Sequence, residues 1–79
     1  MNTSYKIICG VMFKDTGEML ISNNESGGII DRNPTLNKWF VIFNDGRNLG
    51  DVWFDTRNDA IAAFEESQRM RALLDAFVL

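Results

Sequence analysis

The side chains that could carry chemistry in this 79-residue chain are carboxylates and one thiol, because the sequence contains no histidine. Acid–base catalysis by carboxyl groups requires two of them to converge on one pocket. Glu65 and Glu66 are adjacent and would point about 100° apart on a helix, and Asp59 is placed to cap the start of that helix. Cys9 falls within a predicted strand and has no histidine to activate it, so we expect a buried thiol. These patterns predict that the protein is not an enzyme.

Metal and phosphate sites have equally little support in the sequence. The oxygen-rich segments DTGE (15–18) and NDGRNLGD (44–51) do not match a calcium-binding loop. Asn-Asp-Gly between apolar runs is instead typical of a tight turn. The glycines of SGG (26–28) lack the lysine and the strand–helix context of a phosphate-binding loop. We therefore expect no metal and no cofactor.

Negative charge is concentrated between positions 45 and 66, although the net charge of the chain is only −3. The acidic residues of this region are Asp45, Asp51, Asp55, Asp59, Glu65 and Glu66, and the bases among them are Arg47 and Arg57. Such a surface repels a phosphate backbone, so direct nucleic-acid binding is not expected. The acids could instead occupy a basic nucleic-acid channel on a partner protein, or they could serve only to keep an apolar protein soluble.

The first half of the chain predicts one hairpin and a long loop. Tyr5–Phe13 is rich in isoleucine, valine and aromatic residues and is typical of a strand, and Glu18–Ser22 would be the return strand after a turn at 14–17. The segment 23–37 contains Asn-Asn, Gly-Gly and the single proline, Pro34. A loop of this length in a small domain is typically functional or flexible, and Ile29 and Ile30 within it could form a short strand.

The second half predicts another hairpin followed by a helix. KWFVIF (38–43) and DVWFD (51–55) would be strands joined by an NDG turn. Thr56 is a favourable N-cap for a helix over 57–78, which contains no glycine or proline. We therefore predict a single α+β domain (1–79): a small antiparallel sheet of two hairpins and about four strands, with one C-terminal helix packed on it in the order ββ-ββ-α.

Alternation along the predicted strands leaves apolar side chains on both faces of the sheet. The face assigned to the helix contains Ile7, Cys9, Val11, Phe13, Trp39, Val41, Phe43, Val52 and Phe54. The far face contains Ile8, Met12, Phe40, Ile42 and Trp53. A single helix covers one face only, so the far face either contacts a partner or is covered by the segment 23–37, with Ile29, Ile30 and Leu36 as its apolar contacts.

The helix shows a related mismatch between its two halves. Ala60, Ile61 and Phe64 share one direction, whereas the C-terminal stripe points roughly 110° away. That stripe consists of Met70, Leu73, Leu74 and Phe77. We therefore predict a protein–protein interface, through a homodimer or another protein partner, that uses the far sheet face together with Met70, Leu73 and Phe77.

A resemblance to a nucleic-acid-binding family gives the alternative function. The stretch KWFVIFNDG…VWFDTRNDAIAAFEES, covering Lys38 to Phe64, is similar to the small sheet-plus-helix modules of the AP2-like and integrase arm-binding type. The shared pattern is an aromatic strand, a short turn, a strand ending in Phe-x-Thr, and a helix that starts a few residues later. The resemblance implies an accessory module that binds nucleic acid. The family has basic strands, whereas the matching strands here contain Asp51 and Asp55.

Size and charge together favour a small acidic binding protein that acts through protein contacts. In these two properties the chain resembles regulators from phages and mobile elements, including inhibitors of host nucleic-acid-handling proteins. With one cysteine, no signal-peptide pattern and no apolar run near the length of a membrane helix, we expect a cytoplasmic protein with no membrane contact.

Overall fold

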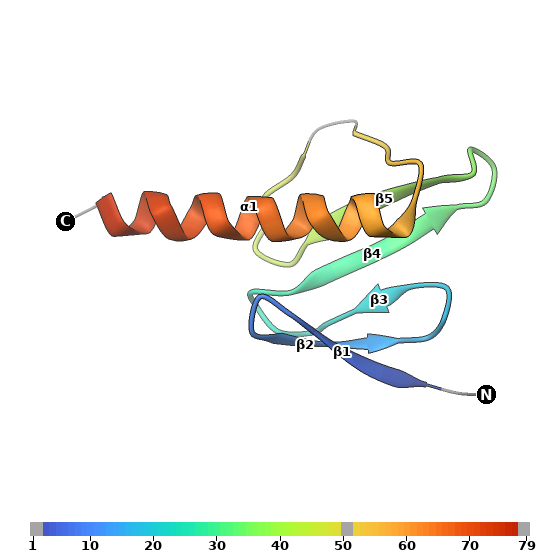
Figure 1. Cartoon of the computed structure of the whole chain (residues 1–79), viewed down its shortest axis with the longest axis horizontal. Coiled ribbons are helices and arrows are strands. Elements are labelled where there is room, and N and C mark those ends of the chain that lie inside the picture. The colour runs from blue at the N-terminus through green and yellow to red at the C-terminus, as the bar shows by residue number, and fades with distance from the viewer. Residues whose placement is uncertain (1–2, 50–51, 78–79) are drawn as a thin grey trace.

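A computed structural model describes residues 3–49 and 52–77, and these residues form an α+β fold with five strands and one helix (Figure 1). The strands build one antiparallel sheet in the order β1-β2-β3-β4-β5, so each strand pairs with its neighbour in sequence. The elements are β1 (Ser4–Ile8), β2 (Val11–Asp15), β3 (Leu20–Ile21), β4 (Gly28–Asn33), β5 (Lys38–Phe43) and α1 (Arg57–Phe77). In the described part of the chain, no helix has the length and apolar character needed to cross a membrane.

The predicted first strand, Tyr5–Phe13, is in fact a hairpin of its own. Cys9 and Gly10 both have positive φ, 53° and 77°, and together form a two-residue turn between β1 and β2. Positive φ at both central positions is the geometry that matches the twist of a two-residue hairpin. Because the turn interrupts the alternation, Ile8 faces the core and Ile7 faces solvent, which reverses the predicted assignment of both.

The segment expected to be a long loop, 23–37, contains strand β4. β4 pairs with β3 on one side and along its whole length with β5 on the other. The backbones approach so closely at Gly28 that a Cβ there would collide with the carbonyl oxygen of Ile42. Glycine at this position therefore permits the β4–β5 pairing, and it explains why a segment with two glycines can be a central strand.

The predicted second hairpin is reduced to a single bridge. Trp39 and Phe54 exchange two backbone hydrogen bonds, at 2.8 and 2.9 Å, but residues around Phe54 form no further ladder in the described part of the chain. The first residue of the predicted strand 51–55, Asp51, lies outside the described residues, as does Gly50. The main strand partner of β5 is therefore β4, and not the segment around Phe54.

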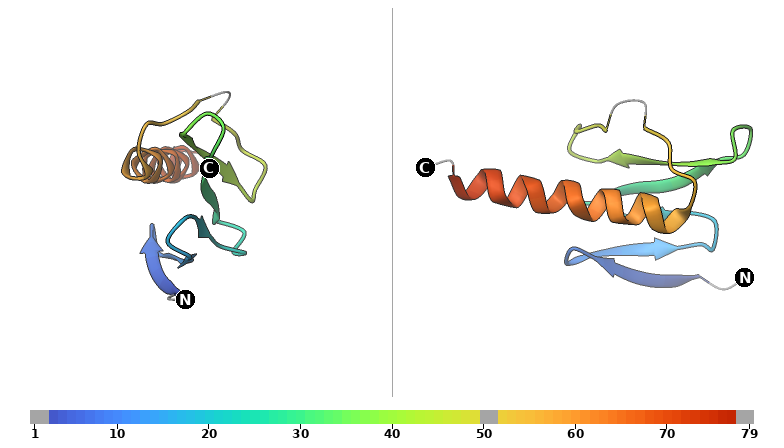
Figure 2. Two further views of the ribbon diagram at one scale, coloured as in Figure 1. Left: turned by 90° about the vertical axis from the view of Figure 1, so that its right-hand side faces the viewer. Right: turned by 45° about the horizontal axis from the view of Figure 1, so that its top comes forward.

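The core lies between one face of the sheet and the first turns of α1. Phe64 is completely buried and contacts Phe13 edge-on and Phe43 in a stacked arrangement, with ring centroids 5.3 and 5.2 Å apart. The core residues are Ile8, Val11, Phe13, Leu20, Ile30, Phe43, Ala60, Ile61 and Phe64, with Trp39, Val41, Leu49 and Phe54 packed against them. The helix lies over β4 and β5 (Figure 2).

Candidate interaction surface

The C-terminal half of α1 extends past the sheet and is exposed on all sides. Figure 1 shows this half projecting beyond the end of the strands, and every residue from Arg69 to Phe77 is exposed. The buried residues of the helix all lie in its first turns. The exposed half carries an apolar stripe whose side chains are between 49% and 82% accessible, with Phe77 the most exposed. We call this the helix stripe: Met70, Leu73, Leu74 and Phe77.

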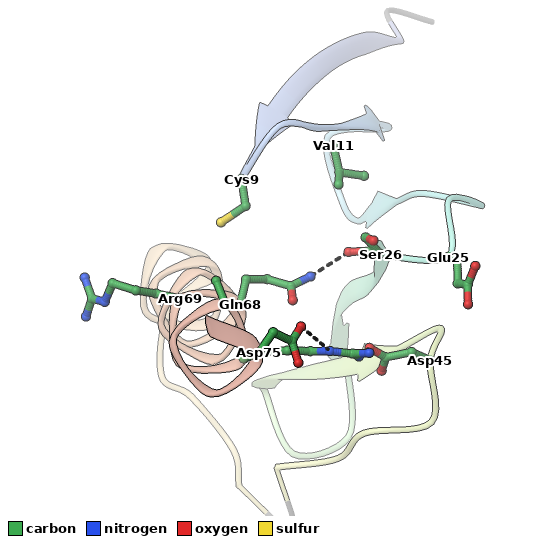
Figure 3. Close-up of a pocket in the computed structure, with 10 residues that line it drawn as sticks. Cys9, Val11, Glu25, Ser26, Asp45, Gln68, Arg69 and Asp75 are labelled. Carbon is green, nitrogen blue, oxygen red and sulfur yellow. Dashed lines mark hydrogen bonds and ion pairs between the residues drawn. The ribbon is translucent and has the colours of Figure 1, made fainter. Parts of the chain in front are cut away.

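The helix stripe faces away from the sheet because polar residues occupy the side of the helix that continues the core face. Continuing from Phe64 at intervals of three and four residues, this side contains Gln68, Arg71 and Asp75. Gln68 donates a hydrogen bond to the carbonyl oxygen of Ser26, at 2.6 Å, as Figure 3 shows. The loop between β3 and β4 therefore meets a polar side chain of the helix here, and the stripe lies on another side of the helix.

Arg47 fixes this orientation by connecting the end of β5 to the middle of α1. Its guanidinium lies 4.4 Å from the ring centroid of Phe43 and donates to the Gln68 side-chain oxygen, at 2.6 Å. The same side chain forms an ion pair with Asp45, at 2.8 Å, and Asp45 also pairs with Arg71 on the helix. Charge-assisted bonds among partly buried groups hold geometry well. The helix therefore has a defined rotation about its axis, and so does the stripe.

The far face of the sheet is the second apolar surface. Ile21, Ile29 and Ile42 stand in register across β3, β4 and β5. At one end of this face Ile7 pairs with Met12, and their side chains are 66% and 59% accessible. At the other end the rings of Phe40 and Trp53 meet edge-on, with centroids 5.8 Å apart. The helix packs on the opposite face, so no helix of the described chain covers these side chains.

The structure distributes the predicted interface residues between this face, the helix stripe and the core. Met12, Phe40, Ile42 and Trp53 lie on the far face, as the alternation indicated. Ile8 lies in the core, 3% accessible, so it cannot line an interface. On the helix, Met70, Leu73 and Phe77 are all exposed.

The segment 23–37 does not cover the far face. Ile30 is part of the core on the helix side, and Leu36 is exposed in the turn between β4 and β5. Ile29 lies within the far face itself. Val52 was assigned to the core face, but it is exposed.

Two exposed apolar residues were absent from the predicted interface because the turn at Cys9-Gly10 was not predicted. Tyr5 and Ile7 share the far face of β1, and both are exposed. The pair Cys9-Gly10 holds the signal that could have placed them, because glycine at the second position suits a turn with positive φ. Leu74 belongs to the helix stripe by its spacing and was passed over among the predicted contact residues.

The predicted acidic patch is divided among separate places on the molecule. Asp55 pairs with Lys38 beside β5, and the hydrogen bond from this lysine lowers the pKa of the Asp55 carboxyl. Glu66 pairs with Arg69 one helical turn later. The backbone N–H of Asp59 donates to the Thr56 hydroxyl, as expected for a helix N-cap, at 3.1 Å.

Among the described residues of the predicted acidic patch, Asp45 is the least exposed, with a side chain that is 12% accessible. Burial opposes its ionisation, but hydrogen bonds from the backbone and side chain of Arg47 outweigh this effect, so the pKa of Asp45 is lowered. Glu65 is exposed, and Asp51 lies outside the described residues. Asp45 is thus part of the contact that holds the helix, rather than part of an open acidic surface.

An open groove of about 490 Å³ lies between the β1–β2 turn and the polar side of α1 (Figure 3). Its lining contains the acids Glu25, Asp45 and Asp75, the base Arg71 and the apolar residue Val11. Cys9 lies at its rim and is exposed, contrary to the expectation of a buried thiol. Partial burial, with the Glu65 carboxylate adding to it, raises the pKa of this thiol, which disfavours the reactive thiolate.

Comparison of the chain with protein-family models, with curated proteins and with solved structures found no significant match. The similarity to AP2-like and integrase arm-binding modules required a hairpin over Lys38 to Phe54. The structure gives one bridge between Trp39 and Phe54 in place of that hairpin, and an additional strand, β4, on the other side of β5. The site is therefore interpreted from its own geometry.

Proposed function

We propose that the protein is a small binding protein whose helix stripe docks into an apolar groove of a protein partner. The observation that carries this proposal is the position of four large apolar side chains at i, i+3, i+4 and i+7 on a projecting helix. A helix that presents such a stripe is a common ligand for a hydrophobic groove. The polar anchor formed by Arg47, Asp45 and Arg71 supports the proposal, since it holds the helix in place without covering the stripe.

Energetics support a contact role for this surface. Complete burial of a leucine, methionine or phenylalanine side chain contributes about 1.5–3 kcal/mol. The four side chains of the stripe are half exposed or more, so a groove that covers them would gain on the order of 5 kcal/mol before the costs of association. Contiguous exposed apolar residues of this kind mark interaction sites in soluble proteins.

Charge defines the second property of the proposed partner. The chain has a net charge of −3, and its exposed acids include Asp59 and Glu65 in the N-terminal half of the helix. A groove with a basic rim would complement them and would associate faster at low salt. A nucleic-acid-handling protein is one class of partner with such a rim, in line with a role as a regulator or inhibitor of such a protein.

A quantitative pull-down with paired variants tests the proposal. Leu73→Gln/Phe77→Gln removes the stripe, and Ala72→Gln/Ala76→Gln places the same side chains on another side of the same half-helix. Glutamine is a good helix former, so both doubles should retain the helix, which circular dichroism checks. We expect a partner that copurifies with wild type and with the alanine-site variant but is lost from the stripe variant. Equal recovery of that partner by all three proteins would contradict the proposal.

A second pair of variants separates the apolar contact from the charge. Asp59→Lys/Glu65→Lys reverses two exposed acids without touching the stripe. If a basic rim contributes, binding weakens in this variant and the wild-type complex becomes weaker as salt is raised. Binding that is insensitive to both changes would leave the stripe as the whole interface and would remove the charge element from the proposal.

A further inference from the structure

The two edge strands of the sheet, β1 and β5, differ in whether another backbone segment bonds to their outer side. The outer edge of β5 is covered where Trp39 and Phe54 exchange backbone hydrogen bonds. β1 forms the opposite edge, and no described strand pairs with its outer side. An uncovered edge presents a row of unpaired N–H and C=O groups that can bind another extended strand. The backbone of β1 is therefore a potential hydrogen-bonding surface.

The register of the first hairpin shows which groups of β1 point outward. A two-residue turn brings Ile8 and Val11 together as a hydrogen-bonded pair. Because bonded and non-bonded pairs alternate along an antiparallel ladder, Lys6 also bonds to its partner, Phe13. The N–H and C=O of Tyr5 and Ile7 then point away from β2. These two residues are the ones that a further strand would bind.

β1 has few of the features by which sheets block strand addition. It is five residues long and contains no proline, and its one protective feature is a single charged residue, Lys6. Tyr5 and Ile7 are 64% and 66% accessible and lie together on the far face of the sheet. A strand that pairs with β1 would cover the flanks of both side chains while it bonds to their backbone.

We propose that β1 pairs antiparallel with β1 of a second copy of this chain, about a two-fold axis at Tyr5. In this register Tyr5 faces Tyr5 of the second copy, and Ile7 faces Thr3, which satisfies the outward groups with about six backbone bonds. A register centred on Lys6 would place two lysines directly opposite each other, which is destabilising. A register centred on Ile7 would require Cys9 to extend, but Cys9 is fixed in the turn with φ 53°.

Pairing in this way removes the open edge. The joined sheet ends at β5 in both copies, where Phe54 already bonds to Trp39. The aromatic rings of Tyr5 in the two copies become a cross-strand pair on the far face, an arrangement that stabilises antiparallel strands. The interface uses β1, whereas the helix stripe lies on α1. The strand pairing therefore does not depend on the proposed partner contact.

Proline substitution tests the pairing because it removes one outward N–H and no bond within the hairpin. Tyr5→Pro is suited to an edge position whose N–H faces solvent, and Tyr5→Thr is the matched control that keeps the N–H. Sedimentation equilibrium over a wide concentration range gives the dimer dissociation constant. We expect a wild-type dimer, a dimer for Tyr5→Thr, and a dissociation constant raised on the order of tenfold to a hundredfold in Tyr5→Pro.

Amide hydrogen exchange in the wild-type protein gives the same test without a substitution. The amides of Tyr5 and Ile7 should exchange more slowly as the dimer forms, whereas the Lys6 amide, bonded within the hairpin, should be protected throughout. A monomer at every concentration overturns the proposal. So does a dimer that survives Tyr5→Pro or leaves the exchange of Tyr5 and Ile7 unchanged. A dimer that is lost only in Leu73→Gln/Phe77→Gln would also overturn it, because the contact would then be the helix stripe.

Discussion

Two phenylalanines in the same helix should respond very differently to the same substitution. Phe64 is completely buried between Phe13 and Phe43, whereas Phe77 is 82% accessible at the end of the helix stripe. Each is replaced by alanine, which is a better helix former, so the intrinsic helix propensity changes in the same direction at both positions. The difference in unfolding free energy then reports mainly tertiary packing.

The structure sets the expected magnitudes. Removing a buried phenylalanine costs about 3–5 kcal/mol, and Phe64 lies toward the upper end because it loses an edge-on and a stacked ring contact as well as its burial. A domain of this length has a total stability of about 4–12 kcal/mol. Phe64→Ala should therefore remove a large part of the total stability. Phe77→Ala should change the unfolding free energy by less than about 0.5 kcal/mol.

Urea denaturation followed by tryptophan fluorescence and far-ultraviolet circular dichroism measures both effects. The measurement is made at low protein concentration, so that association does not add to the stability. A loss of more than about 1 kcal/mol in Phe77→Ala would show that the end of the helix packs within the monomer. That result would refute the reasoning that makes the stripe a contact surface. A small loss in Phe64→Ala would refute the description of the core.

Three further predictions concern the sheet and its ion pairs. Gly28→Ala should destabilise the protein by about 1–3 kcal/mol in the same urea assay, because the added methyl group collides with the Ile42 carbonyl oxygen and must push β5 away. Cys9→Asn should stabilise the fold by about 0.5–1 kcal/mol, since Asn-Gly is the preferred pair for a turn in which both residues have positive φ; an unchanged or lower melting temperature would contradict this. The hydrogen bond from Arg57 lowers the pKa of Asp15 below its ordinary 3.8, so the folded state binds this proton more weakly than the unfolded state. The resulting stability is present above pH 3.8 and is lost as the pH falls through the lower folded pKa, so stability should fall in acid less steeply in Asp15→Asn than in the wild type.

The sequence predicted the class of the fold and the position of the helix better than the strands. Thr56 as an N-cap and an uninterrupted run of helix formers placed the start of α1 correctly. The core face of β5 was also correct: Phe43 is buried, and Trp39 and Val41 pack against the core. In both cases a local signal and a tertiary contact agree, so sequence pattern alone was sufficient.

The strands were mispredicted where a turn consists of only two residues. Cys9-Gly10 stands inside a run of apolar residues and lacks asparagine or aspartate, the usual first residue of such a turn. The run therefore resembled one long strand, and the faces of Ile7 and Ile8 were exchanged as a result. The error followed from the two-residue period itself, since a single turn reverses the assignment of the residues before it.

β4 was predicted only as a possible short strand at Ile29 and Ile30, because the Asn-Asn and Gly-Gly pairs and the proline of this segment are typical of loops. Gly28 is needed here for the close approach of the Ile42 carbonyl, a tertiary requirement that has no signal in the local sequence. The division of the acidic residues was also beyond sequence reasoning. Asp45 and Arg71 are far apart in the chain, and their ion pair exists only because β5 and the helix lie side by side.

Site-specific photo-crosslinking tests the central claim most directly, because it asks which side of the helix touches a partner. A photoreactive amino acid is placed at Leu73, in the helix stripe, and in a parallel protein at Ala72, on the groove side of the same turn. Our account predicts a crosslinked partner from Leu73 and little or none from Ala72. Crosslinks of equal yield from both positions, or from Ala72 alone, would contradict the assignment of the stripe as the binding surface.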